Sequence, residues 1–151
     1  MPCLFPADAA QGLMEHPHLK VLVVEDNEDA AQSLMQMLEL NGYDVALART
    51  GPEGVDIAEG FNPDVILCDI GLPGFDGYEV ARRLRHSDTC GGALLVAVTG
   101  YGQETDRKNA FDAGYNVHVT KPADPRTLVR ILEAAPSWLE AKRSETHTVR
   151  H

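Results

Sequence analysis

Short runs of apolar residues, rich in Val, Leu and Ile, alternate along the chain with segments in which apolar residues recur every three or four positions. Runs at residues 19–24, 64–69, 93–99 and 115–120 have the length of buried strands, and a weaker run covers residues 43–48. A helical pattern follows each run. Five strands alternating with five helices need crossover connections, so the pattern predicts a three-layer, doubly wound α/β domain with a parallel sheet.

Capping residues and periodicity set the expected details of the helices. The first helix follows Asn27, and its inward face is expected to contain Ala30, Leu34, Met37, Leu38 and Leu40. The second follows the capping pattern at Thr50 and is expected to end at Gly60. The third begins at Asp76, and its arginines are expected to form a solvated face: Arg82, Arg83 and Arg85.

Composition limits the classes of protein that fit. The 151 residues suit one domain, and the net charge of -10 argues against direct nucleic-acid binding, which needs clustered Lys and Arg. Three cysteines without metal-ligand spacing indicate a reducing cytoplasm, and neither a secretory signal nor a membrane span is visible. We expect an arm or linker at residues 1–18, the domain at 19–135, and a tail at 136–151 that includes a short helix.

Chemically useful side chains stand where four of the predicted strands end. The first strand ends in Glu25 and Asp26, the third in Asp69, the fourth in Thr99 and the fifth in Lys121. The carboxyl ends of parallel strands meet at one edge of such a sheet, so we expect these residues in one cleft. Three neighbouring carboxylates hold a cation or shift one another's pKa, and an all-oxygen ligand set favours Mg²⁺.

Open coordination positions on such an ion indicate phosphoryl chemistry. Asp69 is then the nucleophile, because a carboxylate can accept a phosphoryl group as an acyl phosphate, while Lys121 and Thr99 contact the phosphoryl oxygens. Taken singly, each residue also has a structural interpretation: Asp69 as a turn cap, Glu25 and Asp26 as acids of a first helical turn, and Lys121 as a surface residue.

Four motifs resemble the receiver domain of two-component response regulators, the CheY-like family: VLVVED at residues 21–26, DIGLPGFDG at 69–77, VTG at 98–100 and VTKP at 119–122. The resemblance covers residues 19–135 and implies a flavodoxin-like (βα)5 fold with strand order 2-1-3-4-5 and a cis Lys121–Pro122 bond. It implies Asp69 as phosphoacceptor, Thr99 and Lys121 as switch hydroxyl and phosphate-binding lysine, and as ligands of Mg²⁺ Glu25, Asp26, Asp69 and the Gly71 carbonyl.

The resemblance also implies partners. A histidine kinase or a histidine phosphotransfer protein would supply the phosphoryl group, and a homodimer would form through residues 104–113, the last strand and the last helix. His118 stands at the switch position where the family often has Phe or Tyr, so it is either a packed side chain or a pH-sensitive switch residue. Both a single-domain regulator and a receiver from a hybrid sensor kinase fit the motifs.

The rival hypothesis is a Mg²⁺-dependent phosphatase with an aspartyl-phosphate intermediate. Such enzymes generally need a second acid two residues after the nucleophile, and here that residue is Gly71. We therefore expect a signalling module that catalyses only its own phosphotransfer and dephosphorylation, rather than an enzyme with other substrates.

Overall fold

The structure is a computed structural model that describes residues 19–72, 75–88, 90–100 and 104–149, without the side chains of residues 104–105 and 143–149. The expected arm at residues 1–18 lies outside the described residues. The elements are, in chain order, β1 (Lys20–Val24), α2 (Glu28–Leu40), β2 (Asp44–Ala48), α3 (Gly51–Phe61), β3 (Val65–Asp69), α4 (Gly77–Arg85), β4 (Leu94–Thr99), α5 (Glu104–Ala113), β5 (Val117–Thr120) and α6 (Pro125–Val149).

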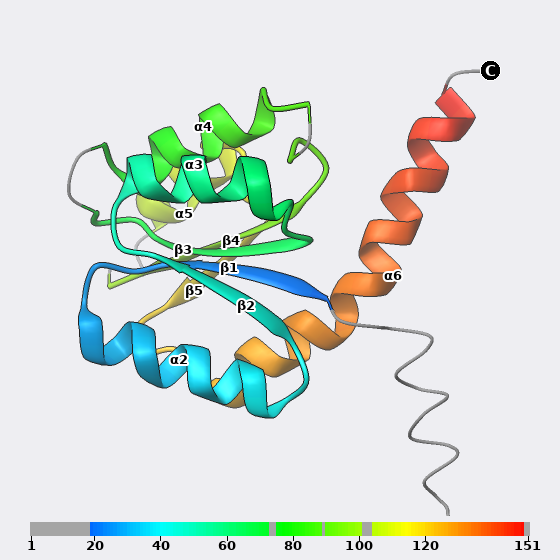
Figure 1. The fold of residues 1–151 in the computed structure, drawn as a ribbon. Coiled ribbons are helices and arrows are strands. Elements are labelled where there is room, and N and C mark those ends of the chain that lie inside the picture. Colours follow the sequence, from blue (N-terminus) through cyan, green and yellow to red (C-terminus); the bar gives the residue numbers. More distant parts are fainter. Residues whose placement is uncertain (1–18, 73–74, 89, 101–103, 150–151) are drawn as a thin grey trace, which may run out of the picture.

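The five strands form one parallel sheet in the order β2-β1-β3-β4-β5, with β2 at an edge (Figure 1). This order and the three-layer fold confirm the predictions. Val24 at the end of β1 pairs with Ala48 of β2 and with Cys68 of β3, so the chain leaves these strands at the same edge of the sheet. No described helix has both the length and the apolarity to cross a bilayer.

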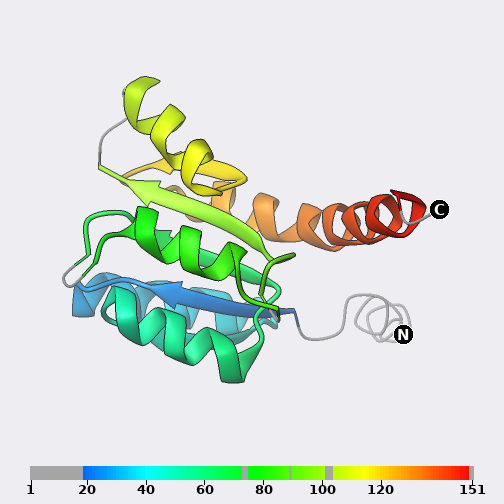
Figure 2. The ribbon, with the colours of Figure 1, turned by 90° about the horizontal axis from the view of Figure 1, so that it is seen from above.

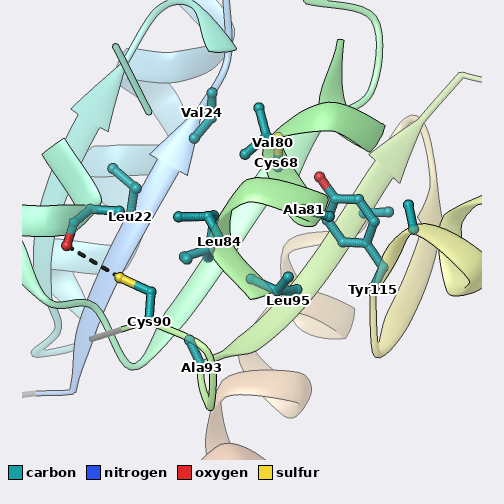
Figure 3. Close-up of a cluster of buried hydrophobic side chains, with 14 of the residues drawn as sticks. Leu22, Val24, Cys68, Val80, Ala81, Leu84, Cys90, Ala93, Leu95 and Tyr115 are labelled. Atoms are coloured by element: carbon teal, nitrogen blue, oxygen red, sulfur yellow. Dashed lines mark hydrogen bonds between the residues drawn. The ribbon is translucent and has the colours of Figure 1, made fainter. Parts of the chain in front are cut away.

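Two apolar clusters cover the two faces of the sheet, because successive strand residues point to opposite faces. Helices α3, α4 and α5 cover one face, and α2 and the first part of α6 cover the other (Figure 1). Cys68 and Cys90 are buried in the first cluster. Figure 3 shows the Cys90 thiol donating to a carbonyl, that of Ala58 at 3.4 Å, so these cysteines act as small core residues.

The inward face of α2 differs from the prediction at two positions. Asn27 caps the helix as expected, accepting a hydrogen bond from Ala30 N at 2.9 Å. The fully buried residues are Ala31 and Leu38, whereas Ala30 is exposed and Leu40 is 88% exposed. Leu40 follows Leu38 by two residues, which is more than half a helical turn, so the two side chains cannot share a face.

Helix α3 ends one residue later than predicted. Its start is as expected, because the Thr50 hydroxyl accepts from Glu53 N at 3.2 Å. The helix runs through Gly60 to Phe61, and Asn62 takes the left-handed conformation (φ 55°) that terminates it. Asn tolerates this conformation better than most residues, so the glycine before it is not needed as a stop.

Helix α6 continues past the expected boundary at residue 135. Pro136 lies inside the helix, and Trp138 and Leu139 pack against the cluster on the α2 side of the sheet. The prediction treated Pro136 as the start of a separate segment, but burial of these two side chains offsets the hydrogen bond that proline cannot donate. Figures 1 and 2 show the later turns of α6 extending away from the sheet.

Arg85 is not part of a solvated face, although Arg82 and Arg83 are exposed and contact Glu79. Its partly buried guanidinium donates five hydrogen bonds of 2.6–2.9 Å, to the carbonyls of three residues and to one side-chain oxygen: Gly91, Ala93, Gly114 and Asn116. Gly114 has φ 123°, and a Cβ there would lie 2.8 Å from Arg85 Cγ. Arg85 therefore fastens the ends of α4 and α5 to the start of β4.

We expect Arg85→Met to lower the free energy of unfolding by about 2–3 kcal/mol, because it leaves partly buried carbonyls without donors. The control is Arg82→Met, which removes only an exposed ion pair and should cost less than about 1 kcal/mol. Urea unfolding of both variants gives the two values. Equal losses would contradict the fastening role of Arg85.

Candidate functional site

The sheet places two acids side by side in a largely buried position. Val24 of β1 pairs with Cys68 of β3, and the residues that directly follow them are Glu25 and Asp69. Their exposed fractions are only 7% and 9%. Burial costs a carboxylate its hydration, so two such neighbours require nearby donors or cations.

A third acid completes a group that could hold a cation. Oxygens of Glu25, Asp26 and Asp69 all lie within 4.8 Å of one another, and Asp26 is exposed. This donor set contains only carboxylate oxygens, which fits Mg²⁺ better than zinc. The exposed position of Asp26 gives access from solvent, so the geometry fits an ion that keeps water or a phosphate oxygen among its ligands.

Lys121 supplies the positive charge of the site. Its Nζ lies 3.1 Å from Asp69 Oδ2 and 3.3 Å from Glu25 Oε1. The peptide bond between Lys121 and Pro122 is cis, as the resemblance implied. Partial burial lowers the pKa of Lys121, but the hydrogen bonds and charges of Asp69 and Glu25 outweigh this effect and raise it. The ammonium group therefore stays charged at neutral pH.

The electrostatics of Glu25 are unfavourable for its charged form. Burial raises the pKa of this carboxyl, and the charge of Asp69 raises it further, against the opposing effects of the Asn27 backbone and Lys121. Asn27 N donates to Glu25 Oε2 at 3.0 Å. A bound cation would relieve the repulsion between the two acids, so the site favours a divalent ion.

Asp69 is held through both of its oxygens. Gly71 N donates to Oδ1 at 3.1 Å, and Lys121 contacts Oδ2. Asp69 is the last residue of β3, and the apolar residues before it in that strand are fully or almost fully buried, which fixes the position of its backbone. An oriented carboxylate beside a cation site can attack an electrophilic phosphorus atom. The ligand role of the Gly71 carbonyl stays a prediction.

Thr99 and His118 occupy different surroundings. Thr99 ends β4 between β3 and β5, its side chain is buried (4% exposed), and its carbonyl accepts from Lys121 N at 2.7 Å. His118 pairs with Ala97 along β5, and its two ring nitrogens are buried without a hydrogen-bond partner among the described residues. Burial lowers the pKa of His118, with a smaller contribution from Arg107.

Arg49 is a site residue that the sequence analysis missed. Its Nη2 donates to the carbonyl of Asp26 at 2.9 Å and lies 4.0 Å from Glu28. Arg49 directly follows β2, whose end lies at the same sheet edge as Glu25. The sequence could have indicated Arg49, because the end of the edge strand β2 borders the cleft as the ends of the other four strands do.

A pocket of about 350 Å³ opens beside the acids. Glu25, Asp69 and Lys121 line one part of it, and apolar side chains from α2, the central strands and the start of α6 line the rest. The acids thus stand at the polar end of a largely apolar pocket.

Comparison with known proteins agrees with this geometry. The sequence model of the "Response regulator receiver domain" family matches residues 21–133. PilH of Pseudomonas aeruginosa is 34% identical over 115 residues, which cover 76% of this chain and 95% of PilH. The polar-differentiation response regulator DivK of Brucella anthropi is 32% identical over 119 residues, covering 79% of this chain and 94% of DivK.

Solved structures give the same result. A CheY-like response regulator receiver domain from Methanospirillum hungatei superposes with a TM-score of 0.77 at 28% identity, over 83% of this chain and 98% of that one. The receiver domain of a sensor histidine kinase from Pseudomonas aeruginosa, with a magnesium ion coordinated in its active site cleft, has a TM-score of 0.74 at 33% identity, over 80% and 98%. With its motifs, fold and acidic cleft in agreement, this chain belongs to the response regulator receiver domain family of two-component signalling.

Proposed function

We propose that the protein accepts a phosphoryl group on Asp69 from the phosphohistidine of a histidine kinase or phosphotransfer protein. The observation that carries the proposal is the placement of Asp69 within 4.8 Å of two other carboxylates and 3.1 Å from Lys121 Nζ. The group of carboxylates favours a bound Mg²⁺, and the Lys121 ammonium favours a phosphoryl anion. Asp69 lies between the two and is therefore the natural acceptor.

The transfer exchanges one bond to phosphorus for another. A carboxylate oxygen of Asp69 forms the new O–P bond while the N–P bond of the donor histidine breaks, and the imidazole keeps the electron pair of that bond. Glu25, Asp26, Asp69 and the Gly71 carbonyl would hold Mg²⁺. When bound, the ion neutralises the charge that spreads over the phosphoryl oxygens.

Two residues would then contact the phosphoryl group on Asp69. Lys121, which contacts Asp69 and Glu25 before transfer, would pair with a phosphoryl oxygen, and the Thr99 hydroxyl would donate to another. Movement of Thr99 would make room for His118 on the neighbouring strand β5 and shift α5. We propose that this change acts on a protein partner, including a second copy bound through α5, β5 and α6, and not on nucleic acid directly.

The location that we propose is the cytoplasm. Cys68 is a free thiol in the core, which fits a reducing compartment. The proposed phosphoryl donor, a histidine kinase or phosphotransfer protein, acts in the same compartment.

We expect incubation with acetyl phosphate and Mg²⁺ to add the mass of one phosphoryl group to the wild type and none to Asp69→Asn. Intact-mass spectrometry gives the result. Asp44→Asn is the control, because Asp44 is an exposed acid at the start of β2, and it should be labelled like the wild type. Equal labelling of Asp69→Asn would refute the acceptor, and sustained turnover of many equivalents would indicate a phosphatase instead.

Lys121→Ala should still accept phosphate but fail to pass on the change, because the acceptor oxygen remains while the cation that reads the phosphoryl group is lost. Hydrogen exchange of α5 and β5, with and without acetyl phosphate, measures this. The wild type and a Lys20→Ala control, changed at the other sheet edge, should both show a phosphorylation-dependent difference. A normal difference in Lys121→Ala would remove this residue from the switch.

His118→Phe should raise the free energy of unfolding by about 1 kcal/mol near neutral pH, because it removes two buried ring nitrogens that have no hydrogen-bond partner in the part of the chain that the structure describes. The lowered pKa of His118 means that the unfolded chain takes up a proton first as the pH falls below about 6.5, so the wild type loses stability there.

Urea unfolding at about pH 7 and about pH 5 should therefore show a smaller loss for His118→Phe than for the wild type. His86 is exposed and its Nδ1 lies 2.8 Å from the Arg82 carbonyl, so His86→Phe should bring no gain. If His118→Phe is less stable than the wild type at neutral pH, the buried position of the two His118 ring nitrogens is wrong.

A further inference from the structure

A buried phenol just before β5 contacts the start of α4, the helix that follows the acceptor aspartate. Tyr115 is 3% exposed, and its hydroxyl donates to the carbonyl of Gly77 at 2.7 Å. Figure 3 shows its ring beside Ala81, with the hydroxyl directed toward the end of the cluster that contains Cys68 and Val80. The bond joins residues that are 38 positions apart, so it fixes the start of α4 relative to the segment before β5.

Gly77 is itself packed onto the end of β3. Its N–H donates to the Ile70 carbonyl at 2.9 Å, and a Cβ at this position would lie 2.7 Å from Ile70 Cα and 2.9 Å from the carbonyl oxygen of Asp69. Gly71 N, the next amide, holds Asp69 Oδ1. The Tyr115 hydroxyl is thus one residue away from the backbone that orients the acceptor carboxylate.

The phenol stays a donor under all ordinary conditions. Burial raises the pKa of Tyr115 well above its usual value, and the neighbouring Cys68 raises it further. Burial also raises the pKa of the Cys68 thiol to about 12, so the thiol beside the Tyr115 hydroxyl is neutral at neutral pH. Tyr115 and Cys68, the residue directly before Asp69, are therefore both neutral inside the core.

We propose that Tyr115 is a positioning residue for the Mg²⁺ site. Its hydroxyl fixes Gly77, and through Gly77 the turn after β3, in the arrangement in which Asp69 and the Gly71 carbonyl take the ion. The inference rests on the proposed function, because that function assigns Mg²⁺ to these residues. Tyr115 touches neither the ion nor the phosphoryl group, so its effect must appear in how readily the site forms.

The test is Tyr115→Phe, which removes the hydroxyl and keeps the ring that fills the core. Titration with Mg²⁺ alone, followed through the amide resonance of Gly71, should give about fivefold weaker binding. Without metal, the Gly77 amide should exchange with solvent faster, while amides of β1 and β4 keep their protection. The control is Tyr43→Phe. This change removes the hydroxyl of a partly buried tyrosine on the α2 side of the sheet and should match the wild type in both measurements.

Unchanged Mg²⁺ affinity and unchanged Gly77 exchange in Tyr115→Phe would overturn the proposal. Equal weakening in Tyr43→Phe, or faster exchange throughout the sheet, would show a general loss of stability and would also overturn it. At low Mg²⁺, Tyr115→Phe should be phosphorylated by acetyl phosphate more slowly than the wild type. At saturating Mg²⁺ the two rates should be equal. If the wild type binds Mg²⁺ but Asp69 takes no phosphate, the proposed function fails while the comparison of Mg²⁺ affinities still decides the role of Tyr115.

Discussion

The ammonium of Lys121 between Glu25 and Asp69 is the contact on which the site depends. Two largely buried carboxylates at neighbouring strand ends would repel each other strongly in surroundings of low polarity. Lys121, at the end of β5, two strands from β3 and three from β1, offsets that repulsion and holds the Asp69 carboxylate in place. The same arrangement keeps the residues ready for a stronger cation, since Asp26 adds a third carboxylate from the solvent side.

The rest of the fold supplies the rigidity that this contact requires. Central strands β1 and β3 are buried on both faces, so their carboxyl ends have little freedom. At the other end of the strands, where β4 and β5 begin, Arg85 binds the loops that follow α4 and α5. One end of the molecule is therefore held by hydrogen bonds to neutral carbonyls, while the other concentrates charge that only a ligand can fully balance.

The sequence was sufficient to predict the strands, their parallel arrangement and the meeting of Glu25, Asp26, Asp69 and Lys121, because strand ends in such a sheet share one edge. The sequence was insufficient where contacts between distant residues determine whether a side chain is buried and which partner it has. Arg85 looked like a surface residue because most of its partners are backbone carbonyls, which carry no sequence signal. Leu40 was misplaced because apolar character outweighed its angular position on the helix. Tyr115 gave no signal, since its partner is also a carbonyl.

Trp138 is the sole tryptophan of the chain, and its ring packs on the α2 side of the sheet with Lys142 Nζ 5.8 Å from the ring centroid. It lines a pocket with Gly91 and Gly114, at the edge remote from the acids. The protein thus contains one tryptophan fluorophore, near the middle of its longest described helix. A change in its emission on phosphorylation would mean that the disturbance had crossed the whole length of the strands.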